Sequence, residues 1–232
     1  MFTIIDTETS SNGYVVDITL KRVNEYGVGI DTLSFITPYL LNENMWYFNS
    51  EYVDLSASQE KTLKLLNLIE TGEREYKTIK DINALIKEYI LDNNDTLLAY
   101  NARFDYLAML NSNLFVPNTF KCLWSMAANS ICKRRDFLDF ALYHKAISAK
   151  GIVKTNAEVV GNFARNYNTG RLLDNSKGYY MIEEHLSESD IEYFELPILR
   201  LLLSEYPDIL GSDDIKSYNY RDFIAYNLYQ PK

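Results

Sequence analysis

The sequence has very few of the residues that build disulfide frameworks or zinc sites. Its 232 residues include 2 cysteines, Cys122 and Cys132, and 2 histidines. The cysteine spacing fits neither a CxxC redox pair nor a four-ligand zinc site, which excludes a disulfide-stapled or zinc-stabilised domain. We therefore expect both thiols to be reduced and to have only structural roles, as in an intracellular protein.

Long apolar runs are also missing. No apolar stretch approaches the roughly 20 residues that are needed to span a bilayer, and the chain opens on a short apolar segment with no basic leader. We expect a soluble cytoplasmic protein with no membrane partner. Because 47% of the residues are hydrophobic, the chain can form a substantial core without a structural metal.

Basic residues are outnumbered, with 23 against 32 acidic residues and a net charge of −9. This balance argues against a protein that coats nucleic acid through a broad basic surface. Residues 121–154 differ, because they carry seven basic residues and two acidic ones. Within this segment, Lys133, Arg134 and Arg135 could guide a phosphate backbone. A solvated basic face explains the same cluster equally well.

The pattern of apolar residues predicts an α/β fold. Residues 2–6, 14–23 and 28–36 alternate with period 2 and are separated by glycine-containing turn signals, as in an antiparallel three-stranded meander. Further short strands are expected near residues 96–100 and 120–123. The predicted helices span about 56–70, 78–90, 104–110, 124–147, 156–166 and 188–204. Strands first and strand–helix alternation afterwards indicate an α/β architecture with a mixed β-sheet, containing the meander plus parallel strands, flanked by α-helices.

The chain shows no internal repeat, low-complexity segment or convincing linker. We therefore expect one catalytic domain over residues 1–205. Residues 213–228 have one more amphipathic pattern, so residues 206–232 are predicted to form a C-terminal helical extension packed on the same domain.

Asp6 and Glu8 lie one residue apart at the end of the first predicted strand. Side chains alternate along a strand, so these carboxylates point to the same side and can share one metal ion. A solvated strand end is the alternative, but Phe2, Ile4 and Ile5 indicate burial. Buried neighbouring acids repel each other unless a cation or a proton lies between them. The pair predicts half of a metal site.

A third acid, Asp105, follows the predicted strand at 96–100, four residues after Asn101. Ligands of open α/β sheets bind at the carboxyl ends of the strands, which is where this segment begins. The alternative is local: Asn101 caps a helix, and Asp105 lies in its first turn, where the helix dipole favours negative charge. Both interpretations can hold together.

A fourth acid, Asp190, comes five residues after His185 and at the start of an apolar helical pattern. Five residues of α-helix correspond to roughly 500°, so two side chains at this spacing lie about 140° apart. We therefore expect His185 to precede the helix and Asp190 to lie in its first turns. Ser187 and Asp190 also resemble a capping box, and a lone histidine is often only structural.

The three segments together resemble the motifs of a known enzyme family. Asp6-x-Glu8, Asn101-x-x-Phe104-Asp105 and His185-x-x-x-x-Asp190 are similar to the exonuclease motifs of the DEDDh-type 3′-to-5′ exonucleases, the DnaQ-like branch of the RNase H-like superfamily. The resemblance covers roughly residues 1–205 and implies an RNase H-like fold. Two positions qualify it. Ser187 stands where the family usually has alanine, and Leu186 stands where the tyrosine-type variant needs tyrosine, which favours the histidine type.

The resemblance implies a metal-dependent exonuclease that releases nucleoside 5′-monophosphates from the 3′ end of single-stranded DNA or RNA. Asp6, Glu8, Asp105 and Asp190 would hold two divalent cations, and oxygen ligands favour Mg²⁺ or Mn²⁺. His185 would take a proton from the attacking water as general base.

The same resemblance suggests contacts with the substrate. Thr9 would contact the terminal 3′-hydroxyl or sugar, and Asn101 would lie beside the substrate strand. Phe104 could stack on the terminal base, because single-strand binders use aromatic side chains in this way. A place in the core is the alternative for Phe104.

Other functional interpretations stay open. The chain could be a noncatalytic nucleic-acid-binding or interaction module with the same fold, an RNA-specific exoribonuclease or oligoribonuclease, or an unrelated α/β protein with coincidental motifs. The sequence favours neither DNA nor RNA, and it identifies no polymerase or other replication partner.

Overall fold

The computed structural model of the chain describes residues 1–10, 12–41, 55–91, 95–116, 120–167, 186–211 and 217–218. Its centre is a seven-stranded mixed sheet with the strand order β4-β3-β2-β1-β5-β6-β7. β1 (Phe2–Thr9) is the middle strand, with antiparallel β2 (Val15–Val23) on one side and parallel β5 (Thr96–Ala99) on the other. The strand that carries Asp6 and Glu8 therefore lies at the centre of the sheet.

The remaining strands extend the sheet in both directions. β3 (Gly29–Ile36) pairs antiparallel with β2, and β6 (Phe120–Cys122) pairs parallel with β5. The predicted antiparallel meander and the predicted parallel strands are thus confirmed. A short edge strand, β4 (Glu75–Tyr76), pairs parallel with β3 and was not predicted, because two residues carry no periodicity of their own.

The other edge strand corrects the sequence prediction. β7 (Ser217–Tyr218) pairs antiparallel with β6, whereas a helix was predicted at these residues. An exposed sheet edge offers unpaired backbone groups, and pairing with them here overrides the local helical pattern. Before it, Pro207–Gly211 form a 3₁₀ helix. The remainder of the predicted extension, residues 212–216 and 219–232, lies outside the described residues.

The described residues form eight α-helices, which lie in or near the predicted helical segments. The helix predicted at about 124–147 is divided into two, and the helix predicted at about 188–204 is interrupted by a π-helix. They are α1 (Leu55–Glu70), α2 (Ile79–Leu91), α3 (Ala102–Asn111), α4 (Leu123–Asn129), α5 (Arg135–Tyr143), α6 (Ala157–Tyr167), α7 (Ser187–Asp190) and α8 (Leu196–Glu205). Two further short 3₁₀ helices are found at Pro38–Leu41 and Ile131–Lys133. A π-helix, η4 (Ile191–Glu195), joins α7 directly to α8. None of the described helices is long and apolar enough to cross a membrane.

The start of α2 shows how local sequence fixes a helix boundary. The Thr78 hydroxyl oxygen accepts a hydrogen bond from the Asp81 backbone N–H at 3.2 Å and donates its own proton to the Asp81 carboxylate at 2.7 Å. Such a cap satisfies a backbone group that the helix itself leaves unpaired, and contributes typically about 1 kcal/mol.

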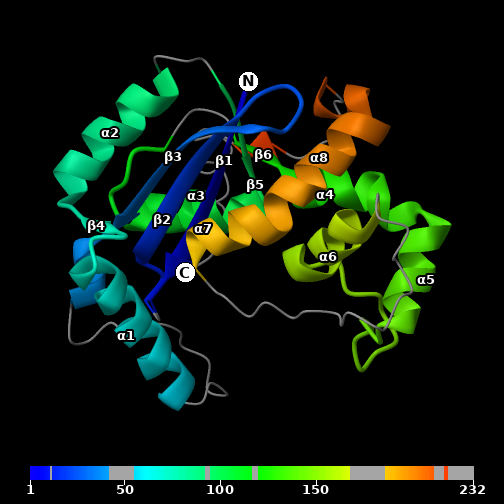
Figure 1. Ribbon diagram of the computed structural model, residues 1–232, viewed down its shortest axis with the longest axis horizontal. Coiled ribbons are helices and arrows are strands. Elements are labelled where there is room, and N and C mark those ends of the chain that lie inside the picture. Colours follow the sequence, from blue (N-terminus) through cyan, green and yellow to red (C-terminus); the bar gives the residue numbers. More distant parts are fainter. Residues whose placement is uncertain are drawn as a thin grey trace, which may run out of the picture.

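The described core contains three apolar clusters, and the two largest of them lie on opposite faces of the sheet. Ile4 and Ile5 are consecutive in β1 and point to opposite faces, so each joins a different apolar cluster. One cluster contains side chains of α4, α5, α6 and α8, and the other contains side chains of α2 and α3. Figure 1 shows α4, α5, α6 and α8 gathered on one side of the strands and α2 on the other. The sheet is therefore a middle layer with helices on both faces.

Candidate metal centre

Three carboxylates from two segments meet at the end of β1. Asp6 and Glu8 are alternate residues of β1, and Asp190 ends α7. Each offers an oxygen atom such that all three atoms lie within 4.8 Å of one another. The structure thus brings Asp190 to the acid pair Asp6 and Glu8, as predicted from the sequence. Glu8 and Asp190 are 182 residues apart in the chain.

Burial and the neighbouring acids strongly perturb Asp6. Its Oδ2 is buried and has no hydrogen-bond partner among the described residues. Burial raises the pKa of Asp6 well above its usual range, and the charges of Glu195, Asp105, Glu8 and Asp190 raise it further. A buried carboxylate in such surroundings is favourable only with a proton or a cation beside it. An all-oxygen set of carboxylates suits Mg²⁺ or Mn²⁺, so these residues fit the predicted ions.

Asp105 reaches the same place from the other side of β1. It lies in the first turn of α3 and is 1% exposed. Its Oδ1 accepts hydrogen bonds from the Thr7 backbone N–H at 3.1 Å and from the Thr7 hydroxyl at 2.9 Å. Burial raises the pKa of Asp105 to about 7, although the Thr7 hydrogen bonds oppose the shift. Asp105 is therefore tied to the residue between Asp6 and Glu8, and its predicted support of a second ion stays a prediction.

The segment that carries Asp190 is anchored to β2. Ser187 donates two hydrogen bonds to Asp17 Oδ2, from its backbone N–H at 3.0 Å and from its hydroxyl at 2.8 Å. The Ser187 hydroxyl also lies 2.7 Å from the Thr19 hydroxyl, and Lys21 pairs with Glu192 just beyond α7. Alternate residues of one face of β2 thus hold the helix that ends at Asp190.

The Ser187 side chain is matched to buried hydrogen-bond partners. It is fully buried, so a hydroxyl at this position needs partners, and Asp17 and Thr19 supply them. Asp17 is itself fully buried and lies opposite Glu8 in the register of β1 and β2. Burial raises the pKa of Asp17, whereas the positive charge of Arg74 and the bonds from Ser187 lower it. Serine at position 187 is thus matched to an acid on the neighbouring strand.

Glu195 is a fifth acid that the sequence analysis missed. It is 2% exposed, and its Oε1 accepts a hydrogen bond from the Tyr100 backbone N–H at 2.9 Å. Its Oε2 is buried without a hydrogen-bond partner in the described part of the chain. Burial raises the pKa of Glu195 well above its usual range, and the charges of Asp105 and Asp190 add to the effect. Glu195 therefore belongs to the same electrostatic cluster.

The π-helix explains how Glu195 reaches the cluster. In an α-helix, residues five apart, such as Asp190 and Glu195, would point about 140° apart. A π-helix bonds residue i to residue i+5, so its wider turn brings residues at this spacing onto one face. Pro197 follows, and proline lacks the N–H that an α-helix would bond to the carbonyl group of Tyr193. The available signal was an acid inside an apolar run, five residues after Asp190 and just before a proline.

The other predicted site residues have mixed outcomes. Thr9 ends β1 at an irregularity in its pairing with β2, next to Glu8. Asn101 precedes α3 with a left-handed backbone (φ 54°), and its side chain makes no capping hydrogen bond. The prediction that the Asn101 side chain caps this helix is therefore wrong. Phe104 is 46% exposed, so its alternative place in the core is also wrong. Its stacking role stays a prediction, and His185 lies outside the described residues.

The three basic residues lie away from the acids. Lys133 ends a 3₁₀ helix, and Arg134 and Arg135 lead into α5, which Figure 1 places at the edge of the molecule beyond α6. The Arg134 guanidinium binds Asp136 at 2.8 Å and the Tyr167 hydroxyl at 2.6 Å. Arg135 pairs with Asp139 one turn later on an exposed face. Guidance of phosphates by these residues stays a prediction.

Comparisons of the chain with protein-family models, with curated proteins and with solved structures produced no match.

Proposed function

We propose that the protein is a metal-dependent 3′-to-5′ exonuclease with an RNase H-like fold, which hydrolyses terminal phosphodiesters of single-stranded DNA or RNA to nucleoside 5′-monophosphates. The observation that carries the proposal is the meeting of Asp6, Glu8 and Asp190 within 4.8 Å. These acids come from two separate motifs of the resemblance, and Asp105 of the remaining motif is bonded to Thr7 between the first two. The mixed sheet with a central β1 and helices on both faces supports the same assignment.

The binding side chains follow from the geometry. Asp6, Glu8 and Asp190 would hold Mg²⁺ or Mn²⁺ through carboxylate oxygens, and the orphaned Oδ2 of Asp6 is a ligand atom in need of a cation. When bound, two such cations neutralise the phosphodiester and stabilise the charge that develops during hydrolysis. Asp105 fixes β1 through Thr7, and Asp17 fixes α7 through Ser187, so both walls of the site are held by buried hydrogen bonds.

Proton transfer is assigned to His185. In this proposal its imidazole accepts a proton from the attacking water, because an unperturbed pKa near 6.5 suits general-base catalysis at neutral pH. His185 stands two residues before Ser187, whose backbone N–H is held by Asp17. The chain next to the proposed base is thus tethered to the same strand that supports Asp190.

The proposal is tested by degradation of 5′-labelled single-stranded DNA and RNA in Mg²⁺, Mn²⁺ and EDTA. The wild type should shorten both or one of the strands stepwise from the 3′ end, release nucleoside 5′-monophosphates and lose activity in EDTA. Asp6→Asn should reduce the rate by at least about 100-fold, because loss of even an outer partner of a metal ligand typically lowers activity by about 10- to 100-fold. Asp139→Asn, which removes a partly exposed acid of α5, should leave the rate unchanged.

Equal stepwise shortening by the wild type and Asp6→Asn would overturn the proposal, as would full activity in EDTA. His185→Gln adds an independent check on the base. This variant should degrade the strand more slowly than the wild type. Mn²⁺ should still raise its thermal unfolding temperature, because the carboxylates are unchanged. If His185→Gln degrades the strand as fast as the wild type, the general base is another group.

A further inference from the structure

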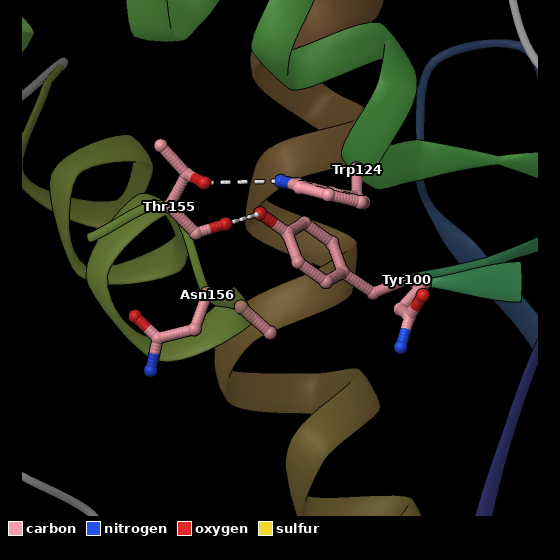
Figure 2. Close-up of a pocket in the computed structure, with 6 residues that line it drawn as sticks. Tyr100, Trp124, Thr155 and Asn156 are labelled. Carbon is pink, nitrogen blue, oxygen red and sulfur yellow. Dashed lines mark hydrogen bonds between the residues drawn. The ribbon is translucent and has the colours of Figure 1, made fainter. Parts of the chain in front are cut away.

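A pocket of about 310 Å³ lies at the carboxyl end of β5, next to the candidate metal centre. Its lining residues are Tyr100, Asn101, Trp124, Thr155, Asn156 and Ala157. They come from the turn between β5 and α3, from α4, and from the segment that enters α6 (Figure 2). Apart from Asn101, none of these residues was singled out by the sequence.

Two aromatic rings of the pocket are held by one residue. Trp124 donates its indole N–H to the Thr155 hydroxyl oxygen at 3.1 Å, and the Tyr100 hydroxyl donates to the Thr155 carbonyl oxygen at 2.5 Å. Figure 2 shows the polar ends of both rings directed toward Thr155. The polar atoms are thus engaged within the protein, and Trp124 keeps 40% of its surface exposed. The rings are preorganised to offer apolar faces to a ligand.

Two amide side chains add polar groups to the same pocket. Asn101 and Asn156 both line it, and both residues are exposed. The left-handed backbone of Asn101 leaves its amide out of the cap of α3. Each amide has hydrogen-bond donors and an acceptor, which can match the edge of a nucleobase. A flat aromatic face beside such amides is the chemistry with which proteins bind unpaired bases.

The pocket and the acid cluster share one stretch of backbone. Tyr100 lines the pocket with its ring and donates its backbone N–H to Glu195 of the acid cluster at 2.9 Å. Asn101, the next residue, leads into α3, whose first turn carries Asp105. A strand with a phosphodiester at the acids therefore passes close to the ring faces.

We infer that this pocket is a nucleobase subsite, in which a base adjoining the scissile phosphodiester stacks on Trp124 and is contacted by Asn101 and Asn156. The inference rests on the proposed function, because it places a base of the same substrate strand. It adds a binding element that uses none of the metal-binding acids. Base binding can therefore be measured without hydrolysis.

The first experiment measures binding alone. Trp46→Phe leaves Trp124 as the sole tryptophan of the chain, so its fluorescence reports on the pocket. In EDTA, nucleoside 5′-monophosphates should quench it saturably, whereas ribose 5-phosphate should not. Absence of quenching by every nucleoside monophosphate, or equal quenching by ribose 5-phosphate, would overturn the subsite. Neither result depends on nuclease activity, so failure of the subsite is distinguishable from failure of the proposed function.

The second experiment measures the contribution to turnover. Trp124→Ala should raise KM for a single-stranded oligonucleotide by about 5- to 150-fold, the range for loss of one stacked base. On a strand with abasic residues on both sides of the terminal phosphodiester, wild type and Trp124→Ala should react equally. Tyr26→Ala, which removes a 75% exposed aromatic residue at the β2–β3 turn, is the matched control and should change neither KM.

Trp124→Phe guards against a variant that does not fold. It retains a stacking face, so it should recover most of the affinity that Trp124→Ala loses, and its thermal unfolding shows whether the fold persists. Equal KM values for Trp124→Ala and the wild type on the base-containing strand would overturn the inference. An equal loss for Trp124→Ala on the base-containing and abasic strands would overturn it as well, because the ring would then act without a base.

Discussion

Ser187 gives both its backbone N–H and its hydroxyl to a single oxygen atom of Asp17, a residue 170 positions earlier in the chain. The two bonds connect the helix that ends at Asp190 to the strand beside Glu8. Both residues are fully buried, so the interaction is shielded from water. The position of Asp190 therefore depends on β2, the strand that pairs with β1 beside Glu8.

This relationship predicts a cost for Ser187→Ala. The substitution removes one donor from a buried carboxylate, so the free energy of unfolding should fall by about 1–3 kcal/mol. Urea denaturation of the metal-free protein measures the change. Ser204→Ala is the control, because Ser204 is exposed and its hydroxyl donates a hydrogen bond to the Leu201 carbonyl oxygen of its own helix at 3.1 Å. Equal stability of Ser187→Ala and the wild type would show that the hydroxyl contributes nothing.

Gly161→Ala should disturb the π-helix. A Cβ atom at Gly161 of α6 would lie 2.6 Å from the Cα atom of Phe194 in η4, which is backbone and cannot rotate away. We expect the free energy of unfolding to fall by roughly 1–3 kcal/mol, as for overpacked cores. The proposed nuclease activity should fall with it, because η4 lies between Asp190 and α8. Denaturation and rate measurements check both effects.

Gly211→Ala is the matched control for that substitution, because an added Cβ there meets nothing within 4 Å. It should leave stability and activity near the wild-type values. A Gly161→Ala protein that is as stable and active as Gly211→Ala would mean that α6 and η4 separate without consequence.

The metal-free protein should lose stability as the pH rises. Burial raises the pKa of folded Asp105 from 3.8 to about 7, so the folded state favours the neutral acid. The stabilisation is complete below about pH 4 and is lost progressively as the pH approaches 7. In EDTA, thermal unfolding measured across this range should show a decline for the wild type. Asp105→Asn keeps the acceptor for Thr7 and should decline less, whereas a parallel decline would contradict the assignment.

Divalent ions should relieve the destabilisation that the clustered carboxylates cause in the metal-free protein. Comparing Asp6→Asn with the wild type should reveal this relief. In EDTA this variant should unfold at the same or a higher temperature than the wild type, because it removes a carboxylate whose buried Oδ2 has no hydrogen-bond partner among the described residues. Saturating Mn²⁺ should stabilise the wild type, by about 2.7 kcal/mol at 100 times Kd, and should stabilise Asp6→Asn much less. The same gain for both proteins would place the Mn²⁺ site elsewhere.

Much of this fold could be predicted because its signals are local. The period-2 pattern of the first 36 residues specified three strands, and the alternation of Asp6 and Glu8 placed both acids on one side of β1. The resemblance of the three segments to the exonuclease motifs also predicted which distant acids would meet, and Asp190 meets Asp6 and Glu8.

What could not be predicted depends on contacts between distant segments. Glu195 joins the acids only because a π-helix replaces the expected α-helix, and its partner is the backbone of Tyr100. The Trp124 ring is held by a hydrogen bond to Thr155, which lies 31 residues later in a segment with no motif. β7 forms because β6 offers an edge, not because its own two residues specify a strand.

The π-helix also acts as a phase shift along a nearly continuous helical segment. It accommodates one residue more per turn than an α-helix, so α7 before it and α8 after it follow different helical registers. Removing one residue from Ile191–Glu195 would rotate α8 by about 100° relative to Asp190. The chain would then have to choose between burying Leu199 and Leu202 in the core and directing Asp190 toward Asp6. The extra residue of the π-helix allows the segment to bury these leucines and to direct Asp190 toward Asp6 at the same time.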